Sequence, residues 1–316
     1  MAQKKVIAVV GATGAQGGGL VRAILADLAG DFTARAIVRD PQSDKSLSLA
    51  ALGAEVVAGD IDDESSLTRA LQGAWGAYFV TFFWAHFSPE REGAEAAIMA
   101  RAAKAANVHH VIWSTLEDTR LLVPLTDTRM PTLMGKYKVP HLDVKGESNR
   151  RFTELGVPTT FLLTSFYWEN LINFGLNPKP GPDGVLGITM PMGDTPLAGI
   201  AAEDIGRCAY GIFKRGDSMI GKTVGIAGDH LTSAQMAATL TKALGREVRY
   251  NAVTPEAFRG FGFPGADDLG NMFQFFRDFP GPFLGARKLD ESRALNPGLQ
   301  DFATWVARNK EKIPLA

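Results

Sequence analysis

Three glycines near the N-terminus have the spacing of a loop that binds phosphate. They are the first, fourth and seventh residues of the run Gly11-Ala12-Thr13-Gly14-Ala15-Gln16-Gly17. A β-branched run at 6–10 precedes this loop and a helical pattern follows it, as a Rossmann fingerprint requires. Glycines there allow a tight turn, close approach of the backbone to a pyrophosphate, and close packing of helix on strand. The loop therefore predicts a dinucleotide site, although the spacing differs from the commoner Gly-x-Gly-x-x-Gly. A glycine-rich turn without a ligand is the alternative.

The end of the second predicted strand favours NADP(H) over NAD(H). An NAD site usually has an acidic residue there, which accepts a hydrogen bond from the ribose 2′-hydroxyl. This chain has Arg39, followed by Asp40. A guanidinium suits a 2′-phosphate because it forms paired, charge-assisted hydrogen bonds. We expect Arg39 to bind this phosphate, with Lys45 as a second cation. The alternative is a solvated Arg39, with Asp40 on the ribose.

Further polar residues follow the third and fourth predicted strands. Asp60, Asp62 and Asp63 come after the third strand, where a Rossmann domain has its adenine pocket. The same carboxylates are equally suited to cap the next helix. Thr81 and Phe82 end the fourth strand, beside the expected ribose and nicotinamide. We expect Asp60, Asp62 and Thr81 to contact the cofactor.

Two side chains near the middle of the chain are suited to move a proton. Lys145 and His141 are four positions apart, which places them on one face of a helix. In a typical short-chain dehydrogenase the residue at the histidine's position is a tyrosine that donates the proton. The nearest tyrosine here, Tyr137, lies beyond Pro140, which would interrupt a helix. Three interpretations stay open: Lys145 holds the ribose of an unreacting cofactor, either residue is a general acid in a reductase, or both are structural.

The ends of the fifth and sixth predicted strands carry residues that suit an apolar substrate pocket. Ser114 closes the fifth strand, where a hydroxyl can orient a carbonyl or simply cap the strand. Phe166, Tyr167 and Asn170 follow the sixth strand. Aromatic residues in such a place are more often part of the core, so a pocket and a core both stay open.

The first half of the chain alternates strands and helices. Strands are predicted at 6–10, 33–38, 55–58, 78–82, 110–113 and 159–163, and helices at 16–28, 64–71, 89–106 and 142–155. This rhythm indicates βαβ units, whose right-handed crossovers build a mostly parallel sheet. We therefore predict an α/β fold: a Rossmann-type doubly wound parallel sheet with a smaller C-terminal α/β lobe.

The second half is less regular. A loop is expected at 175–184, helices at 203–213, 233–244, 267–276 and 301–310, and short strands at 224–227 and 247–251. We predict that residues 1–155 form an NADP(H)-binding Rossmann domain. Residues 156–316 would contribute the last Rossmann strand and a C-terminal lobe for a substrate or a protein partner.

Composition restricts the partners. The net charge is -1 and no basic block is present, which argues against nucleic acid or an anionic membrane surface. The single cysteine, Cys208, excludes an intramolecular disulfide, and the five histidines lack metal-ligand spacing, so no metal is predicted. The most hydrophobic stretch, 75–87, is too short to span a bilayer, and 6–10 is too short for a signal peptide. We expect a cytoplasmic protein.

Several segments, taken together, resemble the NmrA-like family of atypical short-chain dehydrogenases. The similarity runs from the first strand nearly to the C-terminus, and two late segments look like the HSCARG-type branch in particular. The segments shared with the family are the glycine loop, Ala54-Glu55-Val56-Val57-Ala58-Gly59-Asp60, Asp143-Val144-Lys145-Gly146-Glu147 and Glu169-Asn170-Leu171. The two late segments are Phe263-Pro264-Gly265-Ala266 and Asn271-Met272-Phe273.

This resemblance implies an NADP(H)-binding protein with two lobes. Some members sense the ratio of NADPH to NADP⁺ and bind regulatory proteins, whereas related branches are quinone reductases or isoflavone-reductase-like enzymes. The family therefore supports the cofactor more strongly than catalysis. Two hypotheses follow. One is a redox sensor with a regulatory protein partner; the other is an NADPH-dependent reductase of a small apolar quinone, enone or imine that uses Lys145 or His141. A homodimer stays open.

Overall fold

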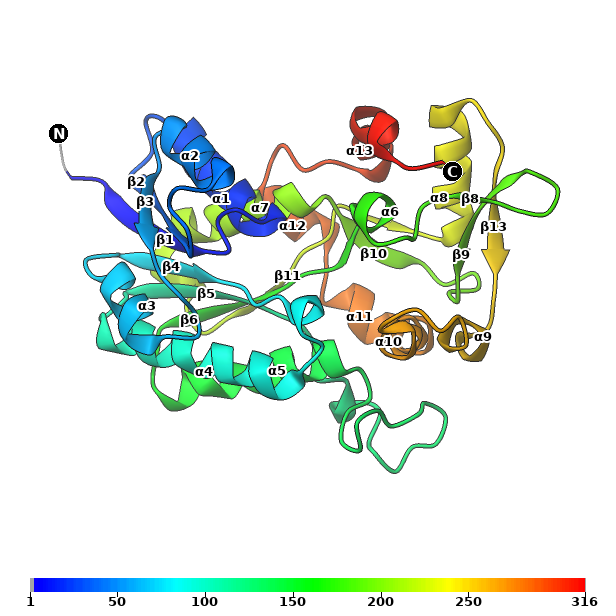
Figure 1. Cartoon of the computed structure of the whole chain (residues 1–316), viewed down its shortest axis with the longest axis horizontal. Helices are drawn as coiled ribbons and strands as arrows, with labels where there is room; N and C mark the ends of the chain where they lie inside the picture. Colours follow the sequence, from blue (N-terminus) through cyan, green and yellow to red (C-terminus); the bar gives the residue numbers. More distant parts are fainter. Residues whose placement is uncertain (1–2, 316) are drawn as a thin grey trace.

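In the computed structural model, which describes residues 3–315, a seven-stranded sheet forms one half of the molecule (Figure 1). Its strands are β1 (Lys5–Val10), β2 (Phe32–Val38), β3 (Glu55–Ala58), β4 (Gly76–Phe79), β5 (His110–Thr115), β6 (Thr159–Leu163) and β11 (Thr223–Gly225). The order across the sheet is β11-β6-β5-β4-β1-β2-β3, and every neighbouring pair is parallel. The predicted doubly wound Rossmann sheet is confirmed.

Helices cover both faces of this sheet (Figure 1). In β1, Ile7 and Val9 pack into the core beneath α1 and α7, whereas Ala8 and Val10 pack into the core beneath α3 and α4. A strand with both faces buried has apolar residues at consecutive positions, which explains the uninterrupted apolar sequence at 6–10. One layer contains α1 (Ala15–Ala26), α2 (Asp44–Ala51), α7 (Ala202–Arg215) and α12 (Leu289–Leu295). The other contains α3 (Glu64–Leu71), α4 (Pro89–Ala105) and α5 (Pro140–Glu154).

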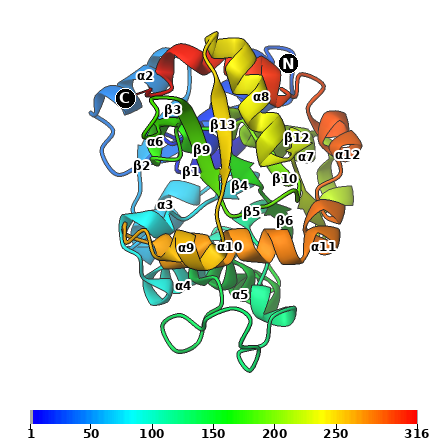
Figure 2. The ribbon, with the colours of Figure 1, turned by 90° about the vertical axis from the view of Figure 1, so that its right-hand side faces the viewer.

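The remaining elements form the expected smaller α/β lobe around a separate core that includes Trp168, Phe273 and Trp305 (Figure 2). One small sheet contains β7 (Phe166–Tyr167), β10 (Leu197–Ile200) and β12 (Asp229–Leu231), and the other β8 (Lys179–Pro180), β9 (Leu186–Met190) and β13 (Val248–Ala252). Its helices are α6 (Asn170–Asn173), α8 (Ser233–Leu244), α9 (Pro255–Arg259), α10 (Ala266–Asp278), α11 (Pro280–Gly285) and α13 (Phe302–Asn309). Four 3₁₀ turns complete the described part of the chain, residues 3–315: η1 (Phe83–Ala85), η2 (Thr119–Leu121), η3 (Gly216–Met219) and η4 (Lys310–Lys312).

The structure differs from the predicted elements at several places. Strand β4 ends at Phe79, because the chain turns into η1 soon afterwards, so Thr81 and Phe82 lie beyond the strand. Helix α5 begins at Pro140, the first helical position, where a missing N–H costs nothing. The predicted loop at 175–184 contains β8. Strand β6 is not the last strand of the sheet, since β11 pairs with it at the edge. The division after residue 155 stays a prediction.

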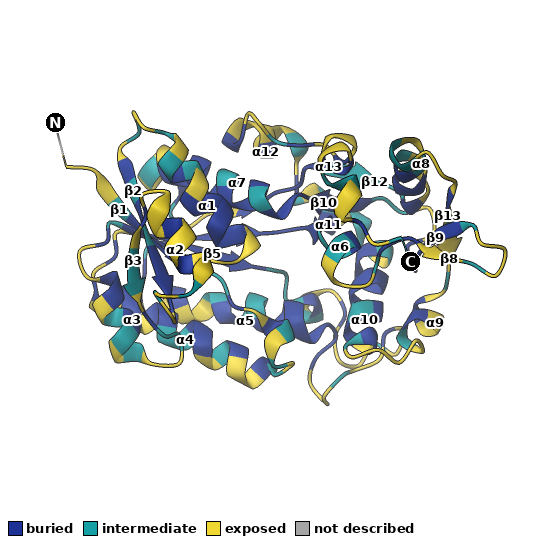
Figure 3. Cartoon of the chain, turned by 45° about the horizontal axis from the view of Figure 1, so that its top comes forward, coloured by how far each residue is buried: buried dark blue, intermediate teal, exposed yellow. Residues whose placement is uncertain are grey.

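Burial follows the layers. Dark blue strands run through the centre of the sheet, and exposed positions collect on the outer faces of the helices (Figure 3). Among residues 3–315, no helix is at once long enough and apolar enough to cross a bilayer.

Helix α1 lies so close to α7 that glycine is required on both helices. A Cβ on Gly206 would lie 2.1 Å from the amide nitrogen of Leu20, and one on Gly19 would lie 2.5 Å from the carbonyl oxygen of Glu203. These distances are shorter than any ordinary nonbonded contact, so the two backbones touch directly. The position of α1 is therefore determined by α7, which comes nearly two hundred residues later in the chain.

Replacing Gly206 by alanine tests this packing. The added methyl group has no room against the α1 backbone, so we expect the free energy of unfolding to fall by about 1–3 kcal/mol. Gly285→Ala in α11 is the matched control, because its Cβ would meet nothing within 4 Å. Thermal unfolding at one scan rate compares the two; a Gly206→Ala variant as stable as Gly285→Ala would contradict the backbone contact.

Candidate functional site

The glycine loop presents an uncapped helix N-terminus to its surroundings. Gly11 has φ +72°, and a Cβ there would lie 2.8 Å from Cγ1 of Val80. Gly14 is the N-cap of α1; no side chain within residues 3–315 caps this terminus, and its first turn has no acidic residue. Thr13, Gly14 and Ala15 are exposed. The amide of Gly14 donates to the carbonyl of Gly11 at 2.9 Å, and the first-turn amides that follow lie at the positive end of the helix dipole, which suits a pyrophosphate.

Gln16 directs its side chain into the protein. Its Oε1 accepts hydrogen bonds from the hydroxyls of Ser114, at 2.9 Å, and Tyr78, and its Nε2 donates to the hydroxyl of Tyr167. Only the backbone of Gln16 is therefore available to a phosphate. Three of the predicted site residues (Gln16, Ser114 and Tyr167) thus meet in one buried network at the carboxyl edge of the sheet.

Neither tyrosine of this network replaces the proton donor that is missing at position 141. Burial raises the pKa of Tyr167 to about 12 and raises the pKa of Tyr78 as well. A dehydrogenase needs the opposite effect, a tyrosine whose pKa is lowered by a nearby lysine. These two hydroxyls therefore orient Gln16, and their raised pKa values differ from the lowered pKa of the usual dehydrogenase tyrosine.

Beyond β2, the two candidate ribose ligands have different surroundings. Arg39 is exposed. The Oδ1 of Asp40 accepts from the amide of Gln42 at 2.8 Å, and its carbonyl accepts from the hydroxyl of Ser46 at 2.7 Å. Asp40 therefore closes the turn that leads into α2. Lys45, in the first turn of α2, is also exposed.

The acidic residues after β3 make local contacts. Asp63 caps α3 by accepting from the amide of Ser66 at 3.1 Å. Asp60 accepts from the amide of Asp62 at 3.0 Å, and Asp62 forms an ion pair with Arg91 of α4 at 2.8 Å. Capping, the alternative noted from the sequence, accounts for Asp63. A contact of Asp60 or Asp62 with an adenosine stays a prediction.

Lys145 lies in a polar cluster just beyond the end of β4. Its Nζ is 2.6 Å from Oε1 of Glu92, 2.5 Å from the hydroxyl oxygen of Thr81 and 3.3 Å from the Thr81 carbonyl oxygen. The Thr81 hydroxyl also donates to Glu92. An ammonium group has three N–H bonds, so each of them has an acceptor within the protein.

His141 makes a different set of contacts, with the C-terminal lobe. Its Nδ1 is 2.6 Å from Oδ1 of Asp268 in α10, and its backbone N–H donates to Oδ2 of the same residue at 3.3 Å. The ring lies 4.8 Å from that of Trp84. The residue is buried, as is Asp268. The imidazole therefore joins α5 to α10.

The sequence prediction missed the two carboxylates that hold these candidates. Both occupy apolar positions of a helix: Glu92 is in register with Ala96 and Met99 on the buried face of α4, and Asp268 with Met272 on α10. A carboxylate in such a row must be paired, since burial of an isolated charge is unfavourable. That rule indicates buried partners, but the identity of the partner depends on the folded chain.

Two further residues predicted for a substrate pocket belong to the C-terminal lobe. Phe166 is part of its core, with its ring 6.0 Å from that of Phe273. This position agrees with the core alternative, and a role in a substrate pocket stays a prediction. Asn170 is half-buried at the start of α6.

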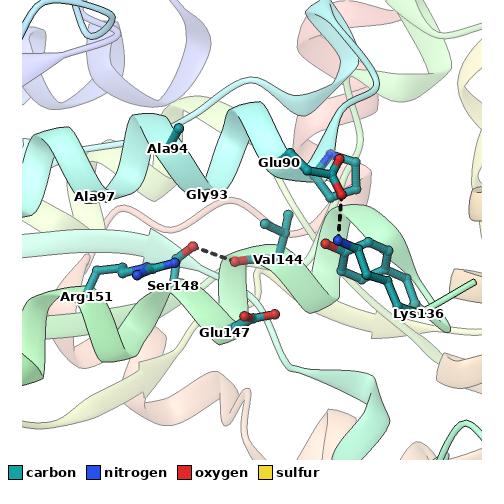
Figure 4. A pocket seen from close by; sticks show the side chains of 11 residues that line it. Glu90, Gly93, Ala94, Ala97, Lys136, Val144, Glu147, Ser148 and Arg151 are labelled. Atoms are coloured by element: carbon teal, nitrogen blue, oxygen red, sulfur yellow. Dashed lines mark hydrogen bonds and ion pairs between the residues drawn. The ribbon is translucent and has the colours of Figure 1, made fainter. Parts of the chain in front are cut away.

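The surface of the molecule has a groove between α4 and α5 and a hollow beside the glycine loop, and neither is lined by Lys145 or Ser114. A groove of about 340 Å³ runs between α4 and α5, where Glu90 and Lys136 form an ion pair at 2.7 Å (Figure 4). A second hollow of about 480 Å³ lies beside the glycine loop, between Ala15, Arg22 and Arg308. Neither hollow is lined by the residues predicted for an apolar substrate pocket: Ser114, Phe166, Tyr167 and Asn170.

Comparison with known proteins agrees with this geometry. The family model of the NmrA-like family matches residues 3–306. The chain belongs to the NmrA-like family. This membership covers the Rossmann half and nearly all of the C-terminal lobe, so both lobes are family features. The membership does not single out the HSCARG-type branch.

Relatives of this NmrA-like chain include oxidoreductases and a regulator. The NmrA-like family domain-containing oxidoreductase FrzB of Cladobotryum sp is 31% identical over 296 residues, 88% of this chain and 86% of that protein. The oxidoreductase lnbB of Aspergillus flavus is 28% identical over 311 residues, 93% and 90% of the two chains. NmrA, a negative transcriptional regulator solved in complex with NADP, has a TM-score of 0.77 at 27% identity, over 97% of this chain and 95% of NmrA. NmrA has also been solved with NAD.

The Gln16 network yields a stability prediction for this NmrA-like protein. Tyr167→Phe removes the acceptor of Nε2 of Gln16, whose side chain is buried, so we expect the free energy of unfolding to fall by about 1–3 kcal/mol. Tyr210→Phe is the control, because its partner Asp27 is half-buried and can turn to water. If denaturant titration finds equal losses for the two variants, the buried network is not what the tyrosine stabilises.

Proposed function

We propose that this protein binds NADP(H) and acts as a redox-responsive regulator, in the manner of the HSCARG-type branch of its family. One observation carries the proposal: both candidate proton donors are held by other side chains. All three N–H bonds of Lys145 have protein acceptors, and His141 is buried against Asp268. A site in which the usual tyrosine is replaced and the lysine is engaged favours binding over turnover.

The choice of NADP(H) rests on the loop and on Arg39. The exposed amides at the start of α1 suit the pyrophosphate, and the exposed guanidinium suits a 2′-phosphate. Asp40 is engaged in its turn, which weakens the NAD alternative. NmrA, solved with both NADP and NAD, supports dinucleotide binding without deciding between the two.

Helix α5 supplies the connection that a regulator needs. It carries Lys145, beside the expected ribose, and His141, which contacts α10 of the C-terminal lobe. A cofactor that binds Lys145 differently in its two redox states would shift α5, and α10 with it. Regulation then requires a protein partner that prefers one of the two arrangements.

Arg39→Ala tests the cofactor choice. Loss of the guanidinium removes about 1.5–3 kcal/mol of charge-assisted hydrogen bonding, so NADPH affinity should fall about ten- to a hundredfold. Binding of NADH, which lacks the 2′-phosphate, should stay within about twofold and serves as the internal control. Calorimetric titration of both ligands decides; parallel losses for NADPH and NADH would contradict a 2′-phosphate site.

A reductase of a quinone, enone or imine is the second candidate. A specific observation favours it: the ammonium of Lys145 lies beside Thr81, just beyond the end of β4, at the edge where a nicotinamide would lie. Several relatives are also named oxidoreductases. When bound, NADPH would supply a hydride to the substrate. Lys145 or His141 would supply the proton.

Turnover of NADPH separates the two candidates. For a regulator we expect thermal stabilisation by NADPH, about 2.7 kcal/mol at a hundred times its dissociation constant, without loss of absorbance at saturating quinone, enone or imine. Steady oxidation of NADPH that Lys145→Ala abolishes would establish the reductase instead. For a regulator, the same variant weakens NADPH binding only.

A further inference from the structure

The carboxylate of Glu92 is the most deeply buried charged group in contact with a predicted site residue. Its side chain has no exposed surface, whereas that of Lys145 is 12% exposed. Withdrawing an ion from water is unfavourable unless a close partner compensates. Each ion of the pair therefore compensates the buried charge of the other, and the pair connects α4 to α5.

Thr81, Lys145 and Glu92 form a closed triangle of hydrogen bonds. Its hydroxyl accepts from Lys145 and donates to Glu92, while the lysine also reaches Glu92 directly. Three elements thereby meet: the segment after β4, helix α4 and helix α5. A lysine side chain is flexible and loses rotamer freedom when it is fixed. The triangle has fixed it already.

The arrangement also shows how Lys145 could serve a ligand without losing its counter-ion. The longest of its three contacts, 3.3 Å, is the one to the Thr81 carbonyl. The second carboxylate oxygen of Glu92, Oε2, is buried and has no hydrogen-bond partner among the described residues. An unpaired buried acceptor is unfavourable and is ready to take a donor. A ligand oxygen could therefore replace the Thr81 carbonyl as an acceptor while the contacts of the ammonium with Glu92 and the Thr81 hydroxyl stay in place.

We propose that Glu92 is a positioning residue for Lys145, which it holds with Thr81 where the ribose of a bound NADP(H) meets the ammonium. The proposal rests on the NADP(H) binding proposed above. Glu92 itself does not touch the cofactor. Its effect on affinity passes through Lys145 and requires that residue.

A double-mutant cycle tests this dependence. NADPH affinity and the emission maximum of bound NADPH are measured for wild type, Glu92→Gln, Lys145→Met and the double variant. We expect Glu92→Gln to weaken NADPH binding about tenfold beside Lys145, and by less than about twofold beside Met. The emission maximum of the Glu92→Gln complex should shift toward that of the Lys145→Met complex, because both variants change the same group beside the nicotinamide ribose.

Glu95→Gln is the matched control. Glu95 lies three residues further along α4, is also buried, and contacts Arg91 and His86 instead of Lys145. Its variant should leave NADPH affinity and emission within the error of wild type. An equal loss in Glu92→Gln and Glu95→Gln would show that any buried carboxylate of α4 has this effect, which would overturn the proposal.

Two further outcomes are decisive. If Glu92→Gln weakens NADPH binding by the same factor with and without Lys145, Glu92 acts on its own, which would contradict the proposal.

If Glu92→Gln does not fold, Glu92→Asp takes its place in the cycle, since it keeps the charge and withdraws it by one methylene. Wild-type protein that binds no NADPH would instead contradict the proposed function, and the role of Glu92 would fail with it.

Discussion

The direct backbone contact between α1 and its neighbours is the constraint on which the site depends. A Cβ on Gly17 would lie 2.4 Å from the carbonyl oxygen of Gly11, so the helix begins almost against the strand that precedes it. Gly206 of α7 presses on the other side. With no side chains between them, these elements cannot slide independently. The outward direction of the first-turn amides follows from this packing.

Helix α5 carries the remaining parts of the site and is anchored as firmly. Buried Asp143 accepts from the amides of Thr119, Lys138 and Val139, and burial raises the pKa of its carboxyl group. Asp268 holds the same helix end from the other lobe. The helix therefore has two supports at its N-terminus: its own Asp143, bound to the segment that precedes it, and Asp268 of the C-terminal lobe. A change at the cofactor that moves α5 must disturb both, which is why this helix suits the proposed regulator better than a surface loop would.

The periodic parts of the fold could be predicted from the sequence. Alternation and helical spacing are local properties, so β3, α3 and β6 lie where the pattern indicates. The end of β4 could not be read in this way, because the turn into η1 breaks the apolar run without a glycine or proline signal. Lys145 and Thr81, expected near one ligand on separate grounds, do meet. Glu92 was missed because its partner is 53 residues away, and no local spacing records such a pairing.

A change of one side chain, that of Gln16, would be enough to prevent a pyrophosphate from binding at the first turn of α1. Gln16→Glu would keep the shape of the side chain, and its carboxylate would still accept hydrogen bonds from the hydroxyls of Ser114, Tyr78 and Tyr167. The added negative charge would lie in the first turn of α1, where it interacts favourably with the positive end of the helix dipole. A pyrophosphate at the same amides would be repelled. Gln16→Glu would therefore remove the pyrophosphate site that we propose while the architecture of the chain stayed the same.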